Sequence, residues 1–126
     1  MSALPESAQR LLAAMLNKSL YVALRTPVDT ARMPSLLEAH LRWAIACEQR
    51  GELFASGPFV ADGAAPGSLG GMSIVRADSL EEAQRILEAD PFVREGLIAL
   101  DIRRWMLMEG GFSVSLRFSD QTGRLF

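Results

Sequence analysis

The chain contains a single histidine, His40, and its surroundings make it the first residue to consider for chemistry. Histidine is the side chain whose charge ordinarily changes near neutral pH, so it often serves as a general acid or base. On a helical wheel His40 falls inside an apolar arc, next to Leu36 and Trp43. This placement predicts a histidine that faces the protein interior. A core histidine bonded to a backbone carbonyl is the structural alternative.

The second candidate is Asp90, which stands directly before Pro91. A residue before proline is driven out of the helical region, so Asp90 is expected to end a helix and lie at a corner. A carboxylate there can accept the ring N–H of a histidine from a neighbouring helix, which fixes the tautomer and raises the basicity of the ring. A turn-forming or capping aspartate is the alternative. Sequence spacing alone does not prove that His40 and Asp90 lie close together.

Five further residues are candidates for binding a substrate. Arg25, at the end of a predicted strand, is suited to clamp a carboxylate or enolate oxygen, unless it is a solvated strand end. Ser56 and Gly57 can present a hydroxyl and backbone groups to a ligand, although Ser56 also fits an ordinary strand position. Trp43 and Phe92 can form the walls of an aromatic pocket, with core packing as the alternative.

Composition narrows the class of protein. The 126 residues (13.8 kDa) suffice for one domain, and 49% hydrophobic with 22% charged residues excludes a disordered chain. The net charge of −2 predicts no nucleic-acid partner, and we expect no membrane span. One cysteine, Cys47, permits no internal disulfide and fits a reducing, cytoplasmic location, and we expect it in the core. One histidine excludes a multi-histidine metal site within one subunit.

Hydrophobic periodicity predicts a helix, then the order β-α-β-β-α-β, then one extra strand. The expected strands cover 19–26, 53–59, 72–76, 97–107 and 112–118; the expected helices lie within 1–16, over 36–50 and from 79 to the residue before Asp90. Gly57-Pro58 is expected to interrupt strand pairing. The order defines a ferredoxin-like α+β fold, an antiparallel sheet with two helices on one face. We expect an N-terminal helical extension over 1–18, the main domain over 19–109, and the extra strand and tail over 110–126.

The second face of such a sheet needs a cover that a chain of this size does not supply. The first strand places Val22 and Leu24 on one face and Tyr21 and Ala23 on the other, so an apolar surface is left over whichever face meets the helices. The sequence therefore predicts an obligate homodimer, buried through the sheet, with the last strand contributing to the contact. A higher oligomer is left open.

Residues 20–105 resemble the YCII-related (YciI-like) domain family. The resemblance is carried by LYVALR, AHLRWAIACEQRGEL, SGPF, ADSLEEAQRILEADPFVREGL and LDIRRW. It implies a ferredoxin-like domain that dimerises into an α/β barrel, with a pocket between sheet and helices. It also implies that His40 and Asp90 form a catalytic dyad. Some members of the family act on chlorinated or hydroxylated aromatic compounds.

Two classes of function fit these observations. The first is an enzyme of lyase, isomerase or dehydrochlorinase type, in which His40 and Asp90 move a proton on a small cyclic or phenolic compound. No metal or organic cofactor is required for such chemistry. The second is a non-catalytic small-molecule-binding or regulatory module, in which the same pair orients a ligand. A haem protein with His40 as axial ligand is a third alternative.

Overall fold

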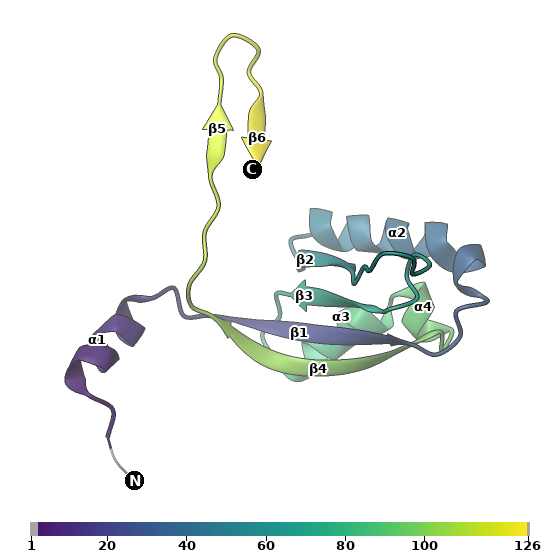
Figure 1. The fold of residues 1–126 in the computed structure, drawn as a ribbon, viewed down its shortest axis with the longest axis horizontal. Helices are drawn as coiled ribbons and strands as arrows, with labels where there is room; N and C mark the ends of the chain where they lie inside the picture. Colours follow the sequence, from purple (N-terminus) through teal and green to yellow (C-terminus); the bar gives the residue numbers. More distant parts are fainter. Residues whose placement is uncertain (1–2, 126) are drawn as a thin grey trace. The chain divides into compact units, whose positions relative to one another are not determined.

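The computed structural model describes residues 3–125, which form two compact units. Residues 19–106 make up the larger unit, and the described parts of 1–18 and 107–126 make up the smaller one. The elements, shown in Figure 1, are α1 (Glu6–Ala14), β1 (Lys18–Pro27), α2 (Met33–Gln49), β2 (Leu53–Pro58), β3 (Gly71–Val75), α3 (Leu80–Glu88), α4 (Pro91–Arg94), β4 (Ile98–Leu107), β5 (Val114–Leu116) and β6 (Gly123–Leu125).

The larger unit is the ferredoxin-like fold that the sequence predicts. Its antiparallel sheet has the strand order β2-β3-β1-β4, and α2 and α3 pack on one face (Figure 1). The main core lies between these layers and consists of Tyr21, Ala23, Cys47, Leu53, Val75, Ala83, Ile86 and Leu87. A second cluster, formed by Phe92, Leu97 and Ile98, packs against Met33 and Leu36 of α2. The two clusters hold α2 and α4 close to the sheet.

Local signals in the sequence set the helix ends. Pro34 lies in the first turn of α2, and Gly51 follows the helix with a φ of +80°, a conformation that glycine adopts without strain. At the start of α3 the Ser79 hydroxyl accepts the Glu82 N–H at 3.1 Å, as the predicted cap requires. The Glu82 carboxylate accepts the N–H of Asp78 at 2.9 Å, one residue before the usual capping-box partner.

Strand β1 separates the two faces of the sheet by simple alternation. Tyr21, Ala23 and Arg25 are buried on the face that the helices cover. Val22 and Leu24 point to the opposite face, where no helix of the larger unit lies. Arg25, near the end of the strand, therefore has its charged side chain in the interior. This alternation brings the arginine to the same side of the sheet as His40.

Strand β2 differs from the expectation in one detail. Gly57 and Pro58 remain paired, opposite Met72 and Gly71, and the register shift lies earlier, between Leu53 and Ala55. The predicted interruption at Gly57-Pro58 is therefore wrong: the proline occupies the end of an edge strand, where its missing N–H costs no ladder bond. Gly71 permits this pairing, because a Cβ there would lie 2.5 Å from the Gly57 carbonyl oxygen.

The smaller unit contains α1 and a two-stranded sheet of β5 and β6. The predicted strand over 112–118 shrinks to three residues, and within the described chain it pairs with β6 and not with the four-stranded sheet. Its apolar row is exposed and consists of Phe112, Val114, Leu116 and Phe118. Alternation shows that a segment can form a strand with one apolar face, but it does not identify the strand's partner.

Candidate functional site

Asp90 lies at the corner between α3 and α4 and is fully buried. Its backbone is extended, with φ −61° and ψ 125°, as expected before a proline. Its Oδ1 atom accepts the Phe92 N–H at 3.0 Å and so caps the short helix α4. The capping role, which the sequence left as an alternative for this aspartate, is therefore present.

His40 projects from α2 towards this carboxylate, and its Nδ1 lies 2.8 Å from Asp90 Oδ1. An ionised carboxylate only accepts hydrogen bonds, so the proton of a neutral His40 ring belongs on Nδ1. The lone pair is then on Nε2. About 20% of the His40 side chain remains exposed, whereas Asp90 has no exposed surface. The pair therefore consists of a fully buried carboxylate and a partly exposed imidazole.

Arg25 supplies the second partner of the aspartate. Its Nη2 donates to Asp90 Oδ2, and its Nη1 lies 3.4 Å from the hydroxyl of Ser73. Ser73 is itself buried and lies 2.9 Å from the hydroxyl of Ser56 on the neighbouring strand. Polar groups of β2, β3 and β1 thus form a row that ends at Asp90. The arginine is 7% exposed, so the solvated strand end that the sequence also allowed is wrong.

The charge of Asp90 follows from opposing effects. Burial alone raises the pKa of this carboxyl group. The hydrogen bond from His40 and the positive charge of Arg25 act in the opposite direction and, together, hold the pKa below that of an ordinary aspartate. Asp90 is consequently ionised at neutral pH. This supports the assignment of the His40 proton to Nδ1.

Two aromatic rings hold the imidazole in place. The ring of Phe92 stacks on His40 with centroids 4.3 Å apart and an interplanar angle of 9°. The indole of Trp43 lies 5.9 Å from the imidazole and is tilted by 32°. Trp43 Nε1 is buried without a hydrogen-bond partner among the described residues. Stacking and the bond to Asp90 together restrict both the tilt and the rotation of the His40 ring.

Cys47 lies one turn of α2 beyond Trp43 and is fully buried. Burial raises the pKa of its thiol, although Arg50 donates to Sγ at 3.3 Å, and the group is therefore a neutral thiol at neutral pH. This matches the expected core role. Within residues 3–125 no three histidine, cysteine, aspartate or glutamate side chains come together as a metal-binding group.

The structure brings most of the predicted site residues together. His40, Asp90, Arg25 and Phe92 are in direct contact, and Trp43 adjoins them. Ser56 joins through a residue that the sequence analysis missed, Ser73. The available signal was a polar residue between Met72 and Ile74 in an otherwise apolar strand. Gly57 follows Ser56 on β2 and pairs with Met72. Substrate binding by these residues stays a prediction.

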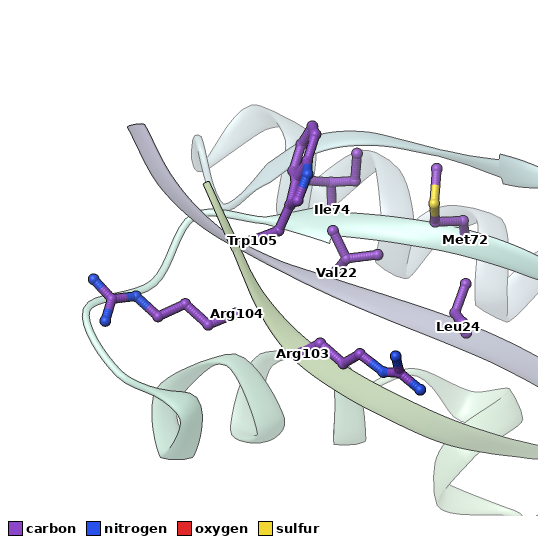
Figure 2. A pocket seen from close by; sticks show the side chains of 7 residues that line it. All are labelled: Val22, Leu24, Met72, Ile74, Arg103, Arg104 and Trp105. Atoms are coloured by element: carbon purple, nitrogen blue, oxygen red, sulfur yellow. The ribbon is translucent and has the colours of Figure 1, made fainter. Parts of the chain in front are cut away.

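A separate hollow of about 370 Å³ lies on the opposite face of the sheet. Its lining residues, labelled in Figure 2, are Val22, Leu24, Met72, Ile74, Arg103, Arg104 and Trp105. The apolar side chains among them project from the same side of the strands (Figure 2). None of these lining residues is His40, Asp90 or Arg25, so this hollow is distinct from the group around His40. No helix among the described residues is long and apolar enough to cross a membrane.

Comparison with known proteins identifies the family. Residues 19–106 match the YCII-related domain, and the chain belongs to this family. Curated proteins give no match. Among solved structures, the chain is similar to 5-chloro-2-hydroxyhydroquinone dehydrochlorinase from Burkholderia phenoliruptrix in complex with 2,5-dihydroxybenzoquinone. The two share 24% identity with a TM-score of 0.57, over 68% of this chain and 92% of the other. At that identity the likeness concerns the fold.

Proposed function

We propose that this protein is a cofactor-independent acid/base enzyme of lyase, isomerase or dehydrochlorinase type. In it, His40 Nε2 takes a proton from a small cyclic or phenolic compound. The observation that carries the proposal is the 2.8 Å contact between His40 Nδ1 and a buried, ionised Asp90, which in the neutral ring puts the proton on Nδ1 and the lone pair on Nε2. Geometry of this kind is typical of a general base with an orienting carboxylate.

Elimination of HX from a ring, with X as a halide, matches what such a base can do. The base takes the proton, the electron pair of the broken bond forms the new double bond, and X leaves with its own pair. No oxidant or reductant is needed. Asp90 stabilises the imidazolium that forms. The dehydrochlorinase of the same fold, crystallised with a quinone, supports aromatic hydroxy compounds as the first substrates to try.

The direct test is chloride release from 5-chloro-2-hydroxyhydroquinone. We expect turnover by the native protein and a loss of at least about a hundredfold in His40→Asn, the usual contribution of a general base. Arg42→Met is the matched control, because Arg42 lies on the same helix in an exposed ion pair with Glu38. Equal rates in native protein and His40→Asn would refute the proposal.

Binding without turnover would favour the alternative, a small-molecule-binding module. Calorimetric titration with 2,5-dihydroxybenzoquinone separates the two classes. A ligand that binds with the same affinity to native protein and His40→Asn, in the absence of any product from chlorinated hydroquinones, contradicts the enzyme. A substrate that is bound and converted by the native protein, but only bound by His40→Asn, supports it.

We also propose that the protein is a homodimer, joined through the uncovered face of the sheet. Leu24, Met72 and Trp105 are 36%, 37% and 39% exposed there, an unusual concentration of large apolar side chains for a monomer's surface. The exposed row of β5 is expected to add to the contact, so truncation after Gly110 should weaken the dimer or cause aggregation. Light scattering at micromolar concentration tests this: a stable full-length monomer would contradict it.

A further inference from the structure

The feature that the dyad leaves unexplained is a buried positive charge. Arg25 and Asp90 are 7% and 0% exposed, and burying two charges costs several kcal/mol unless their pairing is good. An exposed aspartate would not need such a partner. The arginine comes from β1, 65 residues away in the chain, and not from the elements that carry His40 or Asp90. Its presence therefore calls for a role beyond local packing.

The two carboxylate oxygens of Asp90 are divided between different donors. Oδ1 accepts from His40 Nδ1 and from the Phe92 N–H, whereas Oδ2 accepts from Arg25. A carboxylate bound on one oxygen only can rotate about its Cβ–Cγ bond, whose barrier is low. With Oδ2 held by a guanidinium and Oδ1 by a backbone N–H, the plane of the carboxylate is fixed. The direction in which it meets the imidazole is fixed with it.

The guanidinium is held in turn. Its Nη1 lies 3.4 Å from the Ser73 hydroxyl, and Ser73 is fully buried and bonded to Ser56 at 2.9 Å. Ser56 and Ser73 are also direct register partners of β2 and β3. The position of Arg25 thus depends on three adjacent strands, β2, β3 and β1. Its donors face protein groups on both sides, an arrangement that suits orientation of Asp90 better than a clamp on substrate.

We infer that Arg25, supported by Ser73, is a positioning residue. It fixes the carboxylate of Asp90 in its charged form and in one orientation, so that His40 is kept as the Nδ1–H tautomer with Nε2 unprotonated. This inference rests on the proposed function of His40 and replaces the expectation that Arg25 binds substrate. Asp90 faces Arg25 from β1 and both His40 and Cys47 from α2, and Arg25 is the only permanently charged group among them.

The test uses the fact that His40 is the only histidine. In an untagged protein with ¹⁵N-labelled histidine, the two ring nitrogens of His40 are the only imidazole signals. We compare native protein with Arg25→Met, which removes the charge but keeps much of the length, and with Arg25→Lys, which keeps the charge but loses the fork. Arg42→Met is the control, since its pair with Glu38 is exposed on the same helix as His40.

Arg25→Met should shift population from the Nδ1–H to the Nε2–H tautomer, and the Asp90 carboxyl carbon should titrate at higher pH than in the native protein. Arg25→Lys should restore the titration but only part of the tautomer preference. If Arg25→Met does not fold, a native-like tautomer in folded Arg25→Lys contradicts the inference. A folded Arg25→Met that keeps the native His40 tautomer and the native Asp90 titration also contradicts the inference. His40 would then keep its proposed role. An Nε2–H tautomer in the native protein would instead contradict the proposed function.

Discussion

The two faces of the four-stranded sheet use the same strands for opposite purposes. On the helix-covered face, Arg25 and Ser73 lie buried in a hydrogen-bonded row that ends at Asp90 and His40. On the other face, the neighbouring positions Leu24 and Met72 are exposed and line an apolar hollow (Figure 2). The first face contains buried charges that are paired, and the second contains apolar groups that are not covered.

The same short strands form both surfaces. In β1 and β3, successive residues alternate between them, because side chains along a strand point to opposite faces. A buried ion pair contributes little net stability compared with apolar packing, so it is better explained by a requirement for orientation. The uncovered apolar face, in contrast, is the surface through which we propose that two copies of the chain associate.

The largest effect is expected from breaking the buried charge pair. Asp90→Asn leaves the guanidinium of Arg25 buried without a counter-charge, which should lower the free energy of unfolding by about 3–5 kcal/mol. Arg25→Met combined with Asp90→Asn should recover part of that loss, since no uncompensated charge remains. Urea denaturation of the two single variants and the double variant measures the coupling. Additive losses would show that the two side chains do not act as a pair.

A change on the uncovered face should have a different signature. Met72→Lys places a charge among exposed apolar groups, so the folded subunit should tolerate it. The homodimer, if it forms through this face, should dissociate at least about ten times more readily. Sedimentation velocity over a concentration series gives the dissociation constant. An unchanged dimer in Met72→Lys would place the interface elsewhere.

Acid should weaken the helix-covered face through Asp90. Because the folded-state pKa of Asp90 is below that of a free aspartate, the unfolded chain binds this proton first as the pH falls. The stabilisation is complete above the ordinary value of about 3.9 and is lost as the pH falls through the folded pKa. The stability gap between native protein and Asp90→Asn should therefore narrow below about pH 4. A gap that stays constant would contradict the lowered pKa.

The smallest effect is expected at the exposed ion pairs. Arg42 and Glu38 are 2.9 Å apart on α2, but both side chains are more than three-quarters exposed. Arg42→Met should change the free energy of unfolding by at most about 0.5 kcal/mol. Thermal denaturation at low and high salt provides the measurement. A loss comparable to that of Asp90→Asn would show that burial is not what distinguishes the two pairs.

The sequence was sufficient for the main unit of the fold, because its strands and helices carry clear periodicities and caps. The order β-α-β-β-α-β and the helix start at Ser79 are confirmed. The short helix α4 was not predicted, since four residues give no periodicity. The β5–β6 pairing was not predicted either, because alternation over 112–118 does not specify which strand lies beside it.

For the candidate site, the sequence indicated which residues to consider but not which of them are in contact. An apolar helix face suggested His40, and a proline suggested the corner at Asp90, but only folding brings the two within hydrogen-bond distance. Arg25 at a strand end has the same local pattern whether it is solvated or buried. Ser73 has no local signal beyond being a polar residue in an apolar strand. Contacts between residues so far apart in the chain depend on the tertiary fold.

We expect Asp90 to hold the proton of neutral His40 on Nδ1, so that Nε2 is the nitrogen that acts as the base. The ¹⁵N shifts of the imidazole in the native, untagged protein test it most directly, because the chain has one histidine. At a pH well above neutral, we expect a protonated Nδ1 coupled to its hydrogen and an unprotonated Nε2. A predominantly Nε2-protonated ring would contradict it, since that nitrogen would then have no lone pair with which to take a proton.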